Sequence, residues 1–218
     1  IIGLVSYLFS VNKTKQALDL KSKPLQSPEL ENKICALAMA LDLTHLNVNV
    51  YNIETINGLA APGGQIYITQ GFLSKFNKGE VTATEIASVI AHELGHVALG
   101  HTRRRMIDFS GQNALRTALS ITLNRFIPVI GPWLANLAVT IIAARMSRKD
   151  EFEADSYATA LMLKSGLGIQ SQKSLLQKLD KLTGGAESVP AWFMSHPKAG
   201  ERVKAIEFNE KKWTGTVS

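Results

Sequence analysis

One segment near the middle of the chain carries apolar residues at helical spacing. Residues 82–100 read TATEIASVIAHELGHVALG, and Ile86, Val89 and Val97 recur near one face of a helix. Thr82 is followed three positions later by Glu85, which is the signature of a capping box, and Gly100 is a typical helix stop. The pattern predicts a capped, largely apolar helix over residues 82–100.

The rest of the chain alternates between helical and strand patterns. Residues 28–41 begin with a proline suited to a first helical turn and continue with an apolar stripe, which predicts a helix. Residues 46–53, LNVNVYNI, alternate apolar and polar positions as a half-buried strand does. Residues 57–69 contain a Pro-Gly-Gly turn and predict a hairpin, and residues 171–182 predict another helix. We therefore expect an α+β fold, mostly helical, with a small β-sheet beside the helix over 82–100.

A long apolar stretch follows that helix. Residues 126–144, FIPVIGPWLANLAVTIIAA, carry no charge between Arg125 and Arg145. Their length barely reaches that of a membrane span, and two prolines and a glycine divide them into a turn and a helix. We favour two helices that cover the helix over 82–100, with a face that touches lipid as an addition, over a transmembrane hairpin.

Composition narrows the class of protein. The 218 residues, 45% hydrophobic and 19% charged, suit one globular domain. The single cysteine, Cys35, excludes an internal disulfide and is expected to be a small buried residue. The net charge of +6 comes without a nucleic-acid-binding motif, so we expect no nucleic-acid partner. The Arg103–Arg105 run is interpreted as a solvated face, with contact to anionic lipid headgroups as the alternative.

The ends of the chain are less informative. Residues 1–9 are apolar, too short to span a bilayer alone, and followed by several lysines. They are either the stub of a membrane anchor or a segment docked on the core. Because the chain begins with Ile1 and not Met, we expect a processed product. We divide the chain into an N-terminal segment (1–26), a single domain (27–210) and a tail (211–218).

The helix over 82–100 also carries two histidines, His92 and His96, in the sequence His-Glu-Leu-Gly-His. Side chains four apart lie on one face of a helix, as two ligands of one metal must. Glu93 follows the first histidine, where its carboxylate can take a proton from a metal-bound water. Two hydrogen-bonded core histidines are the alternative. Gly95 costs about 1 kcal/mol in a helix, so we expect another backbone to approach it closely.

A second acidic helix completes this chemistry. As a helix, residues 147–158 place Glu151 and Asp155 on one face. Glu151 can supply a third zinc ligand, and Asp155 can hydrogen-bond the far nitrogen of a ligand histidine. Glu153 points away in this register, and a solvated helix N-terminus is the alternative for the whole cluster.

Two further histidines need an interpretation. His196, in a turn before Pro197, is either structural or placed to stabilise an oxyanion. His101, five positions after His96, is interpreted as a helix-end residue.

Four motifs now stand in a recognisable order. They are His92-Glu93-x-x-His96, Ser147-Arg148-x-x-Glu151-x-x-Ala154-Asp155, the hairpin over residues 57–68, and Ser195-His196-Pro197 with Arg202 five residues beyond His196. Together they resemble the HtpX-type and CAAX-prenyl-protease family of zinc endopeptidases, which are gluzincins. The resemblance covers roughly residues 27–206 and is far more specific than any one motif.

The resemblance implies roles for individual residues. One Zn²⁺ per chain would be held by His92, His96 and Glu151, with Glu93 as catalytic base and His196 as a second catalytic residue beside the substrate. Asp155 would orient a ligand histidine, His92. The substrate-binding residues would be Asn57, Gly64, Ile66 and Arg202.

The expected function is that of a zinc metalloendopeptidase that hydrolyses unfolded or membrane-associated proteins in protein quality control. The long spans of integral-membrane members are absent, so we expect a soluble or singly anchored member. We expect a membrane-associated, bacterial location at an anionic membrane surface, on either face of the membrane. A latent member that holds client proteins, like a chaperone, is the main alternative, and a zinc aminopeptidase is a second one.

Overall fold

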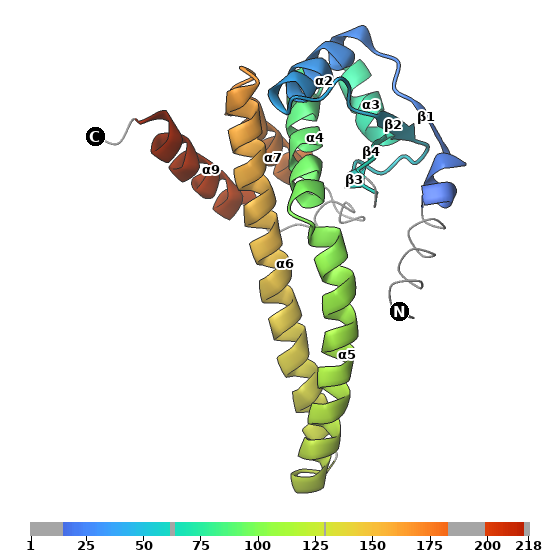
Figure 1. Cartoon of the computed structure of the whole chain (residues 1–218), viewed down its shortest axis with the longest axis vertical. Coiled ribbons are helices and arrows are strands. Elements are labelled where there is room, and N and C mark those ends of the chain that lie inside the picture. The colour runs from blue at the N-terminus through green and yellow to red at the C-terminus, as the bar shows by residue number, and fades with distance from the viewer. Residues whose placement is uncertain (1–14, 62–63, 129, 183–198, 216–218) are drawn as a thin grey trace.

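The computed structural model describes residues 15–61, 64–128, 130–182 and 199–215. A cluster of helices packs beside a small sheet, and a long helical hairpin projects away from both (Figure 1). This arrangement confirms the expected α+β, mostly helical architecture. Residues 1–9, the loop at 183–190 and His196, which the sequence singled out, lie outside the described residues.

The sheet has four strands in the order β1-β2-β4-β3. They are β1 (Ser22–Pro24), β2 (Val48–Tyr51), β3 (Gly58–Ala60) and β4 (Ile66–Thr69). β2 and β4 pair in parallel, whereas β1 pairs with β2 and β3 with β4 in antiparallel fashion. The β3–β4 hairpin confirms the prediction from the Pro-Gly-Gly turn. Because β1 joins the sheet and Leu25 joins the core, the folded unit begins before residue 27.

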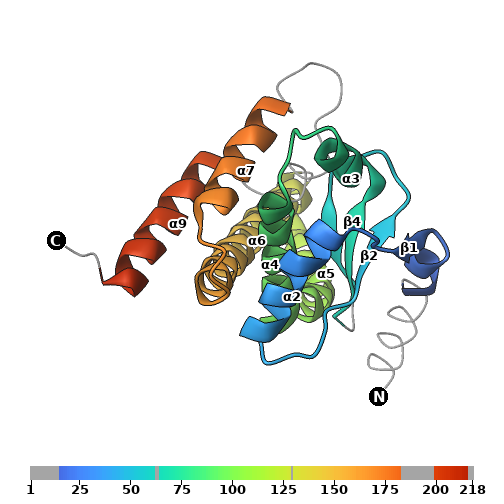
Figure 2. The same cartoon turned by 90° about the horizontal axis from the view of Figure 1, so that it is seen from above.

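Helix α4 (Ala83–Ala98) is the centre of the core. It lies between the sheet and α3 (Gln70–Asn77) on one side and the C-terminal helices on the other (Figure 2). Every residue from Ala83 to His96 is buried except one half-buried threonine, Thr84. α2 (Pro28–Ala40) also packs on α4 through its apolar face, as predicted. Cys35 lies beside that face, not on it, and is exposed, so the prediction of a buried thiol was wrong.

The predicted capping box begins α4. The Thr82 hydroxyl accepts a hydrogen bond from the Glu85 amide at 3.2 Å, and the Glu85 carboxylate accepts one from the Thr82 amide at 2.8 Å. Glu85 also pairs with Lys178 of α7 (Gln170–Leu182) at 2.8 Å. Burial opposes ionisation, but these partners hold the pKa of Glu85 below its ordinary value. The start of α4 is thus tied to a helix nearly a hundred residues further along the chain.

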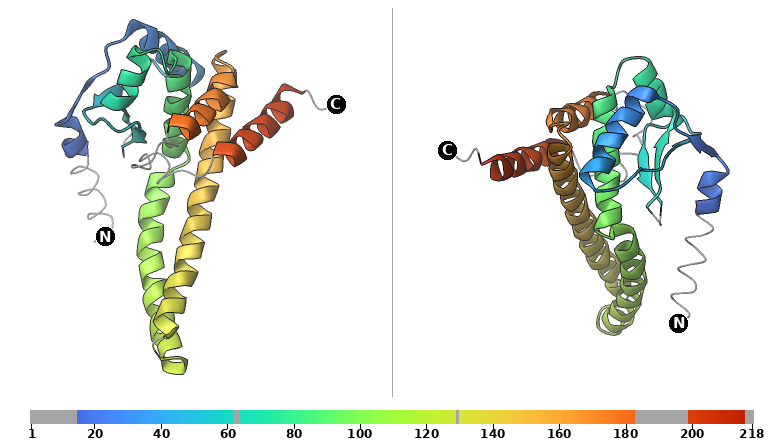
Figure 3. Two further views of the ribbon diagram at one scale, coloured as in Figure 1. Left: turned by 180° about the vertical axis from the view of Figure 1, so that it is seen from behind. Right: turned by 45° about the horizontal axis from the view of Figure 1, so that its top comes forward.

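Helices α5 (His101–Phe126) and α6 (Ile130–Lys164) form the projecting hairpin. Their contact continues along the hairpin beyond the end of α4 (Figure 3). Only the C-terminal part of α6 packs on α4, so the expectation that residues 126–144 cover α4 was wrong. The last helix, α9 (Ala199–Thr214), crosses α6 and α7 and brings Arg202 into the core.

Candidate metal centre

Three ligand atoms meet where α4 and α6 cross. The Nε2 atoms of His92 and His96 are 3.2 Å apart. Oxygens of Glu151 lie 3.3 Å from Nε2 of His92 and 3.4 Å from Nε2 of His96. All three side chains are buried, and Glu151 is fully inaccessible. The structure therefore brings together the three ligands that the sequence indicated from helices more than fifty residues apart.

The spacing of these atoms fits zinc. Ligand atoms about 2.0–2.1 Å from a tetrahedral ion are about 3.3 Å from one another, because that is the edge of the tetrahedron. The distance between the two histidine nitrogens lies within about 0.2 Å of this value, as does the shortest distance from each nitrogen to Glu151, to Oε2 for His92 and to Oε1 for His96. Two imidazoles and one carboxylate are also the ligand type of catalytic zinc, which keeps a fourth position open. The residues present fit the metal in chemistry and in geometry.

The approach of the two helices depends on Gly95. A methyl group at this position would lie 3.0 Å from both the Cα and the carbonyl oxygen of Ala154, and 3.2 Å from Cβ of Tyr157. The expectation of a close backbone at Gly95 is therefore correct. The glycine lowers helix stability but lets α4 and α6 come near enough for Glu151 to reach both histidines.

His92 is held in place from behind by a buried ion pair. Its Nδ1 donates to Asp155 at 2.9 Å, and Arg202 donates two hydrogen bonds to the same carboxylate, at 2.7 and 2.6 Å. Burial opposes the charge, but Arg202 and His92 hold the pKa of Asp155 well below its usual range. In the metal-free site burial also disfavours a charged imidazole, yet the hydrogen bonds that His92 donates to Asp155 and Glu151 raise the pKa of His92 to about 9. Asp155 thus lies where the sequence reasoning expected it.

His96 has its own support, which the sequence reasoning missed. Its Nδ1 lies 2.9 Å from Nδ1 of His101, and Nε2 of His101 lies 3.1 Å from Glu153. If Nε2 of His96 faces a metal, its Nδ1–H donates to His101, whose Nε2–H then donates to Glu153. Burial lowers the pKa of His101, which favours the neutral ring that this chain of hydrogen bonds requires.

The reason for the miss is the break between two helices. A straight helix would carry His101 off the face of His92 and His96. Instead Gly100 adopts a left-handed backbone, φ +66°, and α5 starts in a new direction. The turn brings the imidazole of His101, 1% exposed, back onto His96. In the sequence, Gly100 between two helical patterns was the feature that could have indicated this change of direction.

Glu93 faces the free edge of the sheet. A methyl group added to Gly58 of β3 would lie 2.5 Å from Val89 and 3.7 Å from a carboxylate oxygen of Glu93. β3 thus runs directly along α4 beside the expected catalytic base. Just before it, the backbone of Asn57 bonds to Thr69 in both directions, while its buried Oδ1 has no hydrogen-bond partner among the described residues.

Two other residues expected at the substrate lie elsewhere. Ile66 belongs to the inner strand β4 and is 1% exposed, so it is a core residue. Arg202, also 1% exposed, holds Asp155 behind His92. Gly64 adopts φ +85° in the β3–β4 turn, near Val97. The free edge that a substrate can reach is β3, because β4 is paired on both sides.

Comparisons with known proteins agree with this geometry. The family model described as peptidase family M48 matches residues 24–210. This chain belongs to peptidase family M48. Among the M48 relatives of the chain, the metalloprotease LoiP of Escherichia coli (strain K12) is 31% identical over 161 residues, covering 74% of this chain and 61% of LoiP.

Further relatives extend the comparison. The metalloprotease YcaL of the same organism is 32% identical over 171 residues, covering 78% of this chain and 65% of YcaL. The chain therefore spans less than two thirds of the length of either relative. The solved structure of S. mikatae Ste24p shares the fold with a TM-score of 0.62 and 22% identity, covering 94% of this M48 chain and 57% of Ste24p.

Proposed function

We propose that the chain is a zinc-dependent endopeptidase. The observation that carries this proposal is the meeting of His92, His96 and Glu151, whose donor atoms lie close enough together to bind one zinc ion. When bound, zinc supplies Lewis acidity, which makes water a nucleophile near neutral pH and polarises a peptide carbonyl.

The side chains of this protein transfer the protons and orient the metal ligands. Glu93 takes a proton from the attacking water and passes it to the leaving amine. Asp155 and Arg202 keep Nε2 of His92 directed at the metal position, and His101 does the same for His96. We assign to His196 the stabilisation of the oxyanion, as the family resemblance implies.

An extended substrate fits beside β3. Among the described residues β3 is an edge strand next to Glu93, and a peptide that adds a strand there would present its scissile carbonyl to the water that Glu93 deprotonates. Asn57 lies directly before β3, and its buried Oδ1 has no hydrogen-bond partner among the described residues; we assign it to substrate binding, as the family resemblance implies. Only a chain segment without secondary structure can pair in this way. We infer that the substrates are unfolded or membrane-associated proteins. Gly64 would shape the β3–β4 turn, at the end of the strand to which the substrate adds.

Cleavage of casein tests the proposal. The zinc-loaded chain should cleave it, and Glu93→Gln should lose cleavage by at least a hundredfold while retaining zinc, because only the base is removed. Glu29→Gln, exposed in the first turn of α2 and outside the metal centre, is the matched control and should keep most of the activity. Blocking the N-terminus of a peptide substrate should not prevent cleavage; if it does, the chain is an aminopeptidase. A folded, zinc-loaded chain that binds casein without cleaving it would refute the peptidase and indicate a client-holding protein.

A further inference from the structure

The α5–α6 hairpin has an unusual distribution of apolar side chains. Large apolar residues on it point outward, with Phe126 75%, Ile121 70% and Trp133 60% exposed. On α6, exposed large side chains recur at residues 130, 133, 137 and 141, which is one helical stripe. A patch of this kind on a water-soluble domain marks an interaction surface.

The inside of the hairpin is built from small residues. Ala135 and Val139 are fully buried against α5, and Gly131 is buried one turn before them. A methyl group at Gly131 would lie 2.5 Å from the backbone of Leu123. In water, helices bury their large apolar residues against each other; small residues inside and large ones outside are typical of helices that pack in lipid. α6 also has the length and hydropathy of a membrane-crossing helix, yet only 18% of its apolar window is buried.

The basic residues of the α5–α6 hairpin favour an anionic partner. Between residues 109 and 149 the sequence contains no Asp or Glu and five basic residues: Arg116, Arg125, Arg145, Arg148 and Lys149. Three of the five follow the apolar stripe of α6 directly, on the side nearer the zinc centre. Positively charged residues beside an apolar face favour a surface of acidic lipid headgroups.

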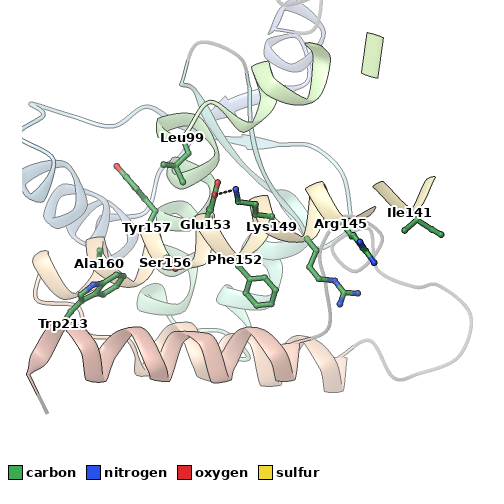
Figure 4. Close-up of a pocket in the computed structure, with 11 residues that line it drawn as sticks. Leu99, Ile141, Arg145, Lys149, Phe152, Glu153, Ser156, Tyr157, Ala160 and Trp213 are labelled. Atoms are coloured by element: carbon green, nitrogen blue, oxygen red, sulfur yellow. Dashed lines mark ion pairs between the residues drawn. The ribbon is translucent and has the colours of Figure 1, made fainter. Parts of the chain in front are cut away.

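A groove continues the stripe toward the body of the protein. It has a volume of about 1060 Å³ and lies between α6 and α9, where Ile141, Phe152 and Trp213 supply apolar walls. Arg145 stands at one end of this groove, next to Ile141, and Lys149 is paired with Glu153 on its rim (Figure 4). The apolar surface and the basic residues are therefore continuous from the hairpin tip into the groove.

We propose that the α6 side of the hairpin docks in the headgroup region of an anionic lipid bilayer. Polar residues of α5, such as Asn113 and Asn124, and Arg125 at the tip make a full crossing costly. An amphipathic face instead lies in the interface, immersed by about 5–10 Å. The stripe from Ile130 to Ile141 then contacts acyl chains while Arg145 and Arg148 contact phosphate.

Flotation with vesicles tests this docking without any use of the peptidase activity. The chain should float with vesicles of phosphatidylcholine and phosphatidylglycerol (3:1), and high salt or pure phosphatidylcholine should reduce the bound fraction. The variant Ile130→Asp with Trp133→Asp should bind at least tenfold more weakly. Phe208→Asp is the matched control, since Phe208 is 69% exposed on α9, away from the tip of the hairpin and not among the residues that line the groove. It should float as the parent does.

The depth of the tip can be measured with Trp133. The variant Trp192→Phe with Trp213→Phe leaves Trp133 as the single tryptophan of the chain. Its emission should shift to the blue on anionic vesicles and be quenched by lipids brominated near the headgroup. Absence of flotation overturns the proposal, as does equal weakening by Phe208→Asp. A hairpin variant that turns a dimer into a monomer, with no lipid bound by the parent, would show a second copy of the chain as the partner instead.

Discussion

Replacing Gly95 by alanine should weaken zinc binding, because this residue sets the distance between the two ligand helices. The added methyl group would lie 3.0 Å from Ala154, whereas carbon atoms pack comfortably at about 3.5 Å or more. α4 and α6 must then separate by about 0.5 Å. Glu151 moves with α6, so its distances to the two histidines exceed the tolerance of about 0.2 Å that a zinc site allows. We expect a zinc affinity lower by at least tenfold.

The stability of Gly95→Ala is a poorer readout than its zinc affinity. Overpacking costs about 1–3 kcal/mol, while the better helix propensity of alanine returns about 1 kcal/mol, so the net loss is small. Competition with a chromogenic chelator measures zinc affinity directly, and urea unfolding measures stability in parallel. Gly200→Ala is the matched control, because no atom lies within 4 Å of its added methyl group in α9. Parental zinc affinity in Gly95→Ala would refute the reasoning.

Three further predictions concern the residues behind the ligands. His101→Ala removes the partner of His96 Nδ1 and should weaken zinc binding by about 10–100-fold in the same competition assay; an unchanged affinity would show that His96 needs no support. Arg202→Met leaves the Asp155 carboxylate buried beside His92 without its cation. This change should lower the free energy of unfolding, measured with urea, by about 3–5 kcal/mol. A surface change such as Lys204→Met should lower it by less than about 1 kcal/mol. In the metal-free chain the pKa of His92 is about 9, against 6.5 in the unfolded chain, so the protonated site stabilises the fold fully below pH 6.5 and this stabilisation is lost as the pH rises through about 9. Zinc must displace that proton, so its affinity should rise about tenfold per pH unit from 7 to 9, and a flat profile would contradict the assignment.

Local patterns in the sequence determined the parts of the site that depend on one helix. The spacing of His92 and His96, the capping box at Thr82 and the cost of Gly95 in a helix all follow from helical geometry, and the structure agrees with each. The carboxylates of Glu151 and Asp155 could be placed on one face for the same reason. Their distances to α4 could not be derived, because the crossing of two helices depends on residues far apart in the chain.

Long-range pairing explains what the sequence left undetermined. Nothing near Val48 indicates that it pairs in parallel with Ile66, and β1 is too short to show a strand pattern. Arg202 binds Asp155, which lies 47 residues earlier in the chain, so the sequence could not pair them, and the family resemblance had instead implied a substrate-binding role for Arg202. The apolar pattern of residues 126–144 gave a helix but not its direction, since an outward apolar stripe and an inward one have the same periodicity.

Because α6 is a single helix, a movement at the tip of the hairpin is transmitted mechanically to Glu151, as along a lever. Its 35 residues run without a break from Ile130 to Lys164, a length of about 52 Å. Around the crossing point at Ala154, Trp133 is about 32 Å away and Glu151 about 4.5 Å away, a ratio of roughly seven to one. A 3 Å sway of the tip therefore moves Glu151 by about 0.4 Å, which exceeds the tolerance of about 0.2 Å for a zinc ligand, so the position of the tip is transmitted to the candidate metal site. A sustained load on the tip is, by the same ratio, multiplied about sevenfold at Glu151.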